Sequence, residues 1–326
     1  MSYNRELEKL PPKFIEKLSR IFNPSLFQRV ARTFNIKRLN TFRVNTIKID
    51  RSALISELKR NNIKVKNVNW YRDAFILLKP ELNEFAKRDL YLDGKVYVQN
   101  LSSMLPPLIL NPGSSDYVLD LTAAPGSKTT QMAAMMQNKG GILAFEKNPV
   151  RFEKLAANLR YQGVVNTELK NEDALGIWRD YSDKFDKVLL DAPCSAEGRF
   201  NISRAKTYRY WNQIRVKRMA KKQKGLIRTA FEALKPGGLL LYSTCTFSPE
   251  ENESVVNYLI RKYPFCCKIE PVNLRVKNIL PALSSWNGVD FAKDIKNCIR
   301  VIPGEFMEGF FIALLRKIKS HHEYSN

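Results

Sequence analysis

Histidine is nearly absent from this 326-residue sequence, since its two copies, His321 and His322, stand side by side near the end of the chain. A Ser-His-Asp or Cys-His catalytic arrangement and a histidine-ligated metal are therefore disfavoured, and we expect no metal centre. Any general acid or base has to be a carboxylate, a lysine or a water molecule. Most hydrolase mechanisms are disfavoured on this ground alone.

Paired cysteines and long apolar runs are also missing. The cysteines, at positions 194, 245, 266, 267 and 298, are odd in number and form no C-x-x-C motif, which argues against a zinc site or a disulfide framework. No apolar run approaches the length of a membrane span, and MSYNRELEKLPPKF lacks the apolar core of a signal peptide. We therefore expect a cytoplasmic protein away from membranes, whose oligomeric state the sequence leaves open.

Negative charge is scarce as well. Lys and Arg number 54 against 32 Asp and Glu, which gives a formal net charge of +22. An excess of this size is typical of proteins with a polyanionic partner, most often nucleic acid, although positive charge also serves solubility.

The chain divides into two regions of different pattern. Residues 1–95 combine helical spacing in LPPKFIEKLSRIF and RSALISELKRNN with short extended pieces, and Asp93-Gly94 reads as a turn. We predict a small N-terminal α+β RNA-binding module over 1–95, a main domain over 96–318 and a disordered tail over 319–326. In the main domain strands alternate with helices, which predicts a doubly wound, parallel α/β sheet with ligands at the carboxyl ends of the strands. Its expected strands are 117–121, 141–146, 166–170, 185–191, 237–245 and 309–317.

The first strand of the main domain runs into the small-residue loop DLTAAPGSKT, 120–129. This loop matches neither the P-loop pattern nor G-x-G-x-x-G, so it lacks a pyrophosphate cradle. Acidic residues follow at the ends of the next strands: Glu146 suits ribose hydroxyls, Asp173 suits an adenine amine, and Asp191 ends the fourth strand. Together with Asp120 they favour S-adenosylmethionine over NAD as the cofactor.

Two cysteines follow the fourth and fifth strands, in DAPCS and STCT. Adjacent parallel strands lie about 4.8 Å apart, so Cys194 and Cys245 are expected to line one cleft. A lone cysteine at a strand end is more often a small buried hydrophobe, but two thiols beside an aspartate suit methylation of carbon 5 of a pyrimidine. We expect Lys128, or a helix capped by Ser248, to favour the thiolate.

The motifs together resemble the Nol/Nop/Sun family of RNA cytosine-C5 methyltransferases. The resemblance extends from RVNTIK (43–48) through YVQNLSSMLP, DLTAAPGSKT, DAPCS and LKPGGLLLYSTCT to EGFFIALLRK. It implies a Rossmann-like methyltransferase sheet in which Cys245 is the nucleophile, Cys194 assists product release, and Asp191 and Lys128 contact the target cytosine. It also implies a cofactor site formed by Ala124, Pro125, Gly126, Ser127, Lys128, Glu146, Arg151, Asp173 and Asp191.

The sequence departs from the family pattern at a few positions. Thr122 replaces a frequent Cys, Ser127 replaces the second Gly of A-P-G-G-K-T, and Ala196-Glu197 stands where Gly-Thr is common. Ser127 is tolerated if its φ is negative, whereas a positive φ there would weaken cofactor binding.

The stretch 199–224 contains ten Lys and Arg residues and no acidic residue, and it is expected to bind RNA phosphates. Tyr208, Tyr210 and Trp211 within it are candidates for stacking on a base, with Trp211 equally suited to be a core anchor.

We expect a structured RNA with a flipped cytosine, with rRNA slightly favoured over tRNA. The alternatives are a catalytically silent RNA-binding protein and a DNA cytosine-C5 methyltransferase with Cys194 as nucleophile. Six basic residues of the N-terminal region are expected to extend the RNA-binding surface: Arg29, Arg32, Lys37, Arg38, Arg43 and Lys48.

Overall fold

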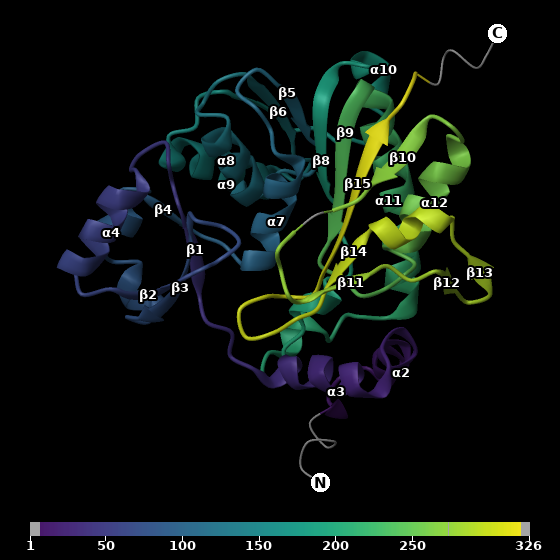
Figure 1. Cartoon of the computed structure of the whole chain (residues 1–326), viewed down its shortest axis with the longest axis horizontal. Helices are drawn as coiled ribbons and strands as arrows, with labels where there is room; N and C mark the ends of the chain where they lie inside the picture. Colours follow the sequence, from purple (N-terminus) through teal and green to yellow (C-terminus); the bar gives the residue numbers. More distant parts are fainter. Residues whose placement is uncertain (1–6, 273, 321–326) are drawn as a thin grey trace.

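The computed structural model describes residues 7–320 except residue 273. Figure 1 shows a small sheet at one side of a large central sheet, with the first helices beneath the large sheet. Ser320, expected in the disordered tail over 319–326, donates a hydrogen bond of 2.8 Å to Asp183, while residues 321–326, with both histidines, lie outside the described residues. Among the described residues no helix is long and apolar enough to cross a membrane.

The small sheet has four antiparallel strands in the order β2-β3-β1-β4. Its core joins aromatic and aliphatic side chains of the strands to Leu54 and Leu58 of the amphipathic helix α4, which begins at an Asp50 cap. The last strand begins one residue beyond the expected boundary at residue 95, so the small sheet continues to Val98. The elements of this part are β1 (Thr41–Val44), α4 (Arg51–Arg60), β2 (Lys64–Asn67), β3 (Ala74–Lys79), α5 (Leu82–Phe85), α6 (Asp89–Leu92) and β4 (Val96–Val98).

The first two helices, α2 (Pro12–Ile21) and α3 (Pro24–Arg32), do not contribute to the core of the small sheet. With the turn η1 (Thr33–Asn35) they share a separate apolar cluster with Phe200, Trp211 and Phe247 of the main domain. Phe14 lies in the middle of this cluster, with its ring centroid 4.8 Å from that of Phe200 and 5.6 Å from that of Trp211. The N-terminal helices therefore form part of the packing beneath the main sheet.

The main sheet follows the order β11-β14-β15-β9-β8-β5-β6-β7, and β10 also pairs with β15. Its first five strands in the chain are parallel, as predicted from the strand–helix alternation. The expected last strand runs antiparallel to β9, because it reaches the sheet from a hairpin-like return rather than from a crossover helix. The strands are β5 (Tyr117–Asp120), β6 (Gly141–Phe145), β7 (Thr167–Lys170), β8 (Phe185–Asp191), β9 (Leu234–Thr244), β10 (Cys267–Glu270), β11 (Ile279–Pro281), β14 (Ile299–Val301) and β15 (Phe310–Lys317).

Helices cover both faces of the main sheet and bury its alternating apolar side chains. One face packs on α7, α8 and α9, and the other on α11 and α12. Asparagine side chains accept hydrogen bonds from backbone amides at the start of α7, α9 and α11 and so fix where these helices begin. The elements are α7 (Leu101–Leu110), α8 (Ser127–Met135), α9 (Pro149–Gln162), α10 (Trp178–Tyr181), η2 (Glu197–Arg199), η3 (Ala205–Thr207), α11 (Gln213–Ala233), α12 (Glu253–Lys262), the hairpin β12 (Ser285–Trp286) and β13 (Val289–Asp290), and η4 (Lys293–Asn297).

Arg43 joins the small sheet to the main domain, which corrects its predicted place on an RNA surface. Its side chain is buried and donates to Gln99 Oε1 at 2.9 Å and to Thr130 Oγ1 at 2.7 Å. Burial lowers the pKa of this guanidinium. Arg43 therefore has a structural role, since a fully buried cation has no access to a phosphate.

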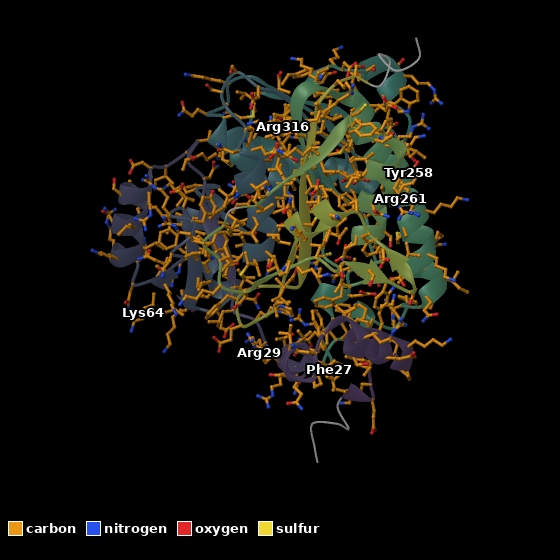
Figure 2. All side chains as sticks on the ribbon, turned by 45° about the vertical axis from the view of Figure 1, so that its right-hand side comes forward. Phe27, Arg29, Lys64, Tyr258, Arg261 and Arg316 are labelled. Atoms are coloured by element: carbon orange, nitrogen blue, oxygen red, sulfur yellow. The ribbon has the colours of Figure 1, made fainter. Side chains whose placement is uncertain are left out.

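The other basic residues expected to extend the RNA surface differ in exposure. Figure 2 shows the exposed side chain of Arg29 at the surface near the first helices. Arg32 and Lys37 are also exposed, whereas Arg38 is half-buried. Lys48 is exposed but donates to the carbonyl oxygen of Asp93 at 2.8 Å.

Gly94 provides a close contact between the two parts of the chain. It has φ +67°, within the predicted turn, and a Cβ placed there would lie 2.5 Å from the carbonyl oxygen of Tyr161 in α9. Beside it, Asn45 Nδ2 donates to the carbonyl oxygens of Gly94 and Gln162 at 2.8 Å each.

We expect Gly94→Ala to lower the free energy of unfolding by more than backbone strain alone explains. Gly288→Ala is the matched control, because Gly288 has φ +77° and a Cβ there would meet nothing within 4 Å. The control is expected to cost about 1 kcal/mol from the left-handed backbone, and Gly94→Ala about 2 kcal/mol more from overlap. Urea unfolding measures both variants, and equal losses would contradict a tight joint at Gly94.

Candidate active site

The two thiols predicted to share a cleft lie together at the ends of neighbouring strands. Strands β8 and β9 are parallel with Asp191 opposite Ser243, so the chain leaves both strands at the same edge. The Sγ atoms of Cys194 and Cys245 are 3.4 Å apart. A hydrogen bond with Cys245, and then burial, raises the pKa of Cys194 well above its ordinary value. The two thiols are thus in hydrogen-bond contact with each other.

Asp191 and Lys128 form an ion pair beside the thiols. Lys128 Nζ donates to Asp191 Oδ2 at 2.6 Å and to Ser103 Oγ at 2.9 Å. Ser243 Oγ donates to Asp191 Oδ1 at 2.8 Å. The lysine side chain is only 8% exposed whereas that of Asp191 is 31% exposed, so the carboxylate keeps a face toward the cavity. Lys128 is thus held by Asp191 and does not contact a thiol through any hydrogen bond in the described part of the chain.

A cavity of about 470 Å³ opens in front of these groups, at the carboxyl ends of the parallel strands. Asp120, predicted to be the first acidic residue of this edge, does not line it. Its side chain is buried and accepts from Thr129 Oγ1 at 2.8 Å, and burial raises its pKa to about 6. Among the predicted site residues the lining includes Ala124, Pro125, Ser127, Lys128, Glu146, Arg151, Asp173, Asp191, Cys194 and Cys245.

Gly126, predicted to be part of the cofactor site, does not line the cavity either. With φ +104° it turns the chain into α8, and its α-carbon faces Leu155 and Leu159 of α9. Ser127 is the first residue of α8 and is not among the residues with positive φ, so a side chain at this position causes no backbone strain. Thr122, the other departure in the loop, donates to the carbonyl oxygen of Asp191 at 2.9 Å and ties the loop to β8.

The other two acidic residues predicted for the cofactor site, Glu146 and Asp173, follow β6 and β7 and line the cavity. Glu146 is almost fully buried, accepts from the Asn148 amide at 2.9 Å and pairs with Arg151 at 3.1 Å. Arg151 in turn donates to the carbonyl oxygen of Ala124, which holds the small-residue loop against α9. Asp173 pairs with Lys147 at 3.2 Å. Each carboxylate is oriented by its partner while remaining in the wall of the cavity.

A larger groove of about 1010 Å³ adjoins the cavity, and the two share Gln99, Asn100, Ala196, Arg199 and Glu308 among their lining residues. It runs between residues 35–41 and residues 195–215, which include part of the predicted phosphate-binding stretch. Tyr210 is 59% exposed in this groove, whereas Trp211 is buried in the core. The basic side chains that line the groove are Lys37, Arg38, Arg199, Arg204, Lys206 and Arg215.

The predicted helix start at Ser248 is wrong. Helix α12 begins at Glu253, and the preceding residues form turns held by side chains from elsewhere. Ser248 is engaged by Glu197 instead of capping a helix, and Asn252 Oδ1 accepts from Thr244 Oγ1 at 2.6 Å. The preference of serine for a helix N-cap did not decide the helix start here, because Ser248 forms hydrogen bonds to a residue distant in sequence.

Arg199 is a cavity residue that motif reasoning did not find. It lies in η2, directly after the Cys194 loop, and its Nε is 3.5 Å from Glu308 Oε2. The charge of Glu308, followed by that of Cys245, raises the pKa of Arg199. Arg199 therefore adds a cation to the wall of the cavity beside the Cys194 loop. Ser103, Lys222 and Glu308 were missed as well, because each lies far in sequence from the two cysteine motifs.

Comparison with known proteins adds the family to this geometry. Residues 107–316 match the family model described as 16S rRNA methyltransferase RsmB/F, and residues 10–101 match the N-terminal domain of 16S rRNA methyltransferase RsmF. Ribosomal RNA small subunit methyltransferase F from Erwinia tasmaniensis is 36% identical over 95% of this chain and 64% of its own length. The tRNA (cytosine(49)-C(5))-methyltransferase from Pyrococcus abyssi is 36% identical over 97% of this chain and 99% of its own length.

The chain belongs to the RsmB/F methyltransferase family. The family resemblance of the motifs is thereby confirmed. The crystal structure of NSun6 from Pyrococcus horikoshii with SFG has a TM-score of 0.79, with 26% identity over 96% of this chain and 100% of that one. The main sheet is accordingly a Rossmann-like methyltransferase sheet, as predicted, and S-adenosylmethionine is the cofactor of this family member.

Glu251 is a buried carboxyl group that contacts Ser195, the residue after Cys194. Its Oε2 accepts from the Ser195 amide at 2.9 Å and from Gln223 Nε2 at 3.0 Å, while its Oε1 contacts Ser195 Oγ. Burial, followed by the charge of Glu197, raises the pKa of Glu251 to about 8. Ser195 Oγ, which donates to Glu251 Oε1, also lies 2.7 Å from Thr246 Oγ1.

We expect the stability of the protein to fall as the pH rises from about 5 to 8. The folded state retains the Glu251 proton, whereas the unfolded chain releases it above the ordinary pKa of 4.5. Glu251→Gln mimics the protonated acid, so its melting temperature is expected to depend less on pH across this range. Glu250→Gln, a change at the neighbouring position, should keep the pH dependence of the unchanged protein. The same slope in Glu251→Gln and the unchanged protein would contradict a buried neutral acid.

Proposed function

We propose that this protein methylates carbon 5 of a cytosine in structured RNA, in the cytoplasm, through a covalent bond between Cys245 and carbon 6 of the base. The observation that carries this proposal is the 3.4 Å approach of the Cys194 and Cys245 sulfur atoms beside the Asp191–Lys128 ion pair. Membership of the RsmB/F family supports the same reaction class.

In the proposed reaction the Cys245 thiolate adds to carbon 6 of the cytosine. The new S–C6 bond moves an electron pair to carbon 5 and makes that carbon a nucleophile. As the thiolate adds, negative charge moves onto N3, and the Asp191–Lys128 pair, with Asp191 held by Ser243, supplies the proton that N3 takes up.

The geometry of the cavity fits the cofactor. S-adenosylmethionine supplies an electrophilic methyl group on a sulfonium centre. Glu146 offers a carboxylate for ribose hydroxyls and Asp173 an acceptor for an adenine amine, while Ala124, Pro125, Ser127 and Arg151 form the wall between them. Gly126 contributes to this wall only through the turn that it permits.

Cys194 is proposed to release the product. Its raised pKa depends first on Cys245, and this cause disappears once the Cys245 sulfur is bonded to carbon 6. Cys194 then gives its own proton to water and, as a thiolate, takes the proton from carbon 5. The C5–C6 double bond re-forms, the S–C6 bond breaks, and its electron pair returns to Cys245 as a thiolate.

The RNA is proposed to lie in the basic groove, with the target base turned into the adjoining cavity. Six basic side chains line the groove, and the exposed ring of Tyr210 stands where a flanking base can stack on it. The N-terminal RNA-binding module predicted over residues 1–95 would extend this surface. Bisulfite sequencing of total RNA with and without the protein identifies the target, and a site in rRNA would support the preference drawn from the sequence.

Cys245→Ser is expected to abolish methyl transfer from labelled S-adenosylmethionine to RNA, because a hydroxyl is a far poorer nucleophile than a thiolate. Cofactor binding measured by calorimetry should be unchanged, which separates loss of chemistry from loss of fold. Turnover retained by this variant, or transfer to DNA but not to RNA, would contradict the proposal.

Cys194→Ala is expected to trap the protein on its RNA. Addition at Cys245 and methyl transfer still occur, but no thiolate removes the proton from carbon 5. A band of protein joined to RNA should appear on a denaturing gel and should be absent in the double variant that also carries Cys245→Ser. A Cys194→Ala protein that turns over normally without this band would refute the release role.

A further inference from the structure

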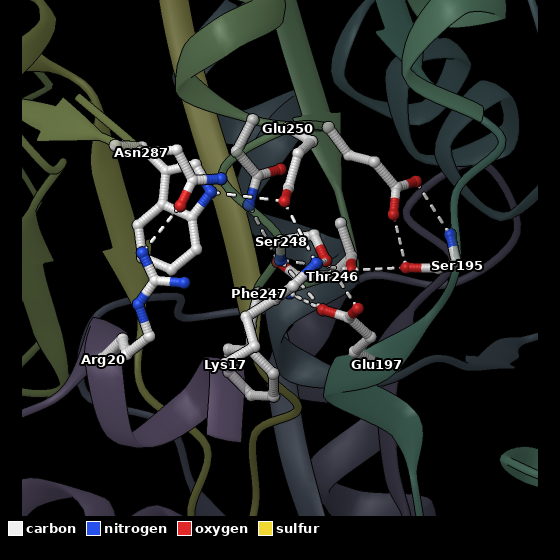
Figure 3. A network of polar contacts seen from close by, with 12 residues as sticks. Lys17, Arg20, Ser195, Glu197, Thr246, Phe247, Ser248, Glu250 and Asn287 are labelled. Atoms are coloured by element: carbon white, nitrogen blue, oxygen red, sulfur yellow. Dashed lines mark hydrogen bonds and ion pairs between the residues drawn. The ribbon is translucent and has the colours of Figure 1, made fainter. Parts of the chain in front are cut away.

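Glu197 is a buried carboxylate that motif reasoning did not assign to any role in the reaction. It begins the η2 turn, three residues after Cys194, and is fully buried. Four donors surround its two oxygens: Trp211 Nε1 at 2.7 Å, the Phe247 amide at 2.9 Å, and the Ser248 amide and hydroxyl at 2.8 and 2.6 Å. Figure 3 shows that Glu197 points from its own turn toward the loop that follows Cys245.

Lys17 of helix α2 reaches the same loop from the opposite side. Its Nζ donates to Ser248 Oγ at 2.9 Å and pairs with Glu250 Oε2 at 3.1 Å, and its side chain is only 6% exposed. Ser248 Oγ therefore links the ammonium of Lys17 to the carboxylate of Glu197 (Figure 3). The positive charge of Lys17 compensates a carboxylate that would be costly to bury alone.

The backbones of the two cysteine loops are also joined directly. The Gly198 amide donates to the carbonyl oxygen of Cys245 at 2.9 Å, and Ser195 Oγ lies 2.7 Å from Thr246 Oγ1. Every residue from 245 to 248 thus has a hydrogen bond to the segment 195–198. Glu197 supplies three of these bonds, and it is the charged group among them.

We propose that Glu197 is a positioning residue that, with Lys17, holds the Cys245 loop against the Cys194 loop at the spacing that the two-thiol reaction requires. This inference rests on the proposed function, because it assigns Glu197 to the geometry of that reaction. Glu197 acts only through the two loops, since it is buried beneath them and does not line the cavity.

Glu197→Gln tests the proposal with little change in shape. A glutamine side chain has one acceptor oxygen, and its NH₂ group would face donors, so the four hydrogen bonds cannot all form. Misplacing a reacting atom by about 1 Å lowers a rate on the order of a hundredfold. We expect kcat to fall by about tenfold to a hundredfold, while the KM values for RNA and for S-adenosylmethionine change little. Glu197→Asp, which keeps the charge, should recover part of kcat.

The matched control is Glu232→Gln. Glu232 is also buried and accepts from Tyr263, but it lies in the last turn of α11 and has no hydrogen bond to either cysteine loop. Both variants are compared at temperatures equally far below their own melting temperatures. A selective loss of kcat in Glu197→Gln supports the proposal. Equal losses in both variants, or an unchanged kcat in Glu197→Gln, would overturn it.

Lys17→Met gives an independent test if Glu197→Gln does not fold, with the exposed Lys13 of the same helix changed to Met as the control. In the Cys194→Ala background, Lys17→Met should slow formation of the covalent adduct severalfold, whereas Lys13→Met should not. Equal adduct rates for the two lysine variants would overturn the role of Lys17. Failure of the proposed function is a separate result, because it appears as an active Cys245→Ser protein.

Discussion

The parallel pairing of β8 with β9 is the constraint on which the active site depends. Its register sets Asp191 opposite Ser243, so β8 and β9 end at the same edge of the sheet. The two cysteine loops that follow these strands therefore begin side by side. The same register lets Ser243 donate to Asp191, which orients the carboxylate toward Lys128. One strand pair thus positions both thiols and Asp191, while Lys128 reaches Asp191 from α8.

Close backbone packing behind the loops makes this arrangement rigid. A Cβ at Gly198 would lie 2.1 Å from the carbonyl oxygen of Gly309, and a Cβ at Gly309 would lie 2.3 Å from the ring of Phe247. The antiparallel strand β15, which begins directly after Gly309, is therefore in contact with the turn that carries Glu197. Its direction, which strand–helix alternation did not predict, brings EGFF back to the cavity and accounts for Glu308 and Phe310 in the lining.

Much of the main domain was predictable because its signals are local. The alternation of apolar strands with periodic helices predicted the parallel part of the main sheet. The motifs DAPCS and STCT predicted that Cys194 and Cys245 follow the ends of strands. Residues whose position depends on distant contacts were not predictable. Arg43 looked like part of a basic surface, yet it is buried against α8, and Arg199 looked like one charge of a long basic stretch, yet it lines the same cavity as the thiols. Sequence spacing carries no information about which basic side chain the fold encloses.

The segment SPEENE shows how such enclosure changes the meaning of a motif. Its serine, proline and acidic residues match the preferences of a helix N-terminus, yet helix α12 starts only at Glu253. The preceding side chains are used elsewhere: Ser248 bridges Lys17 and Glu197, Glu250 pairs with Lys17, and Glu251 holds Ser195. A helix cap would satisfy only local amides. These contacts instead join α2 and both cysteine loops, so residues that look like a helix signal are better explained as the support of the active site.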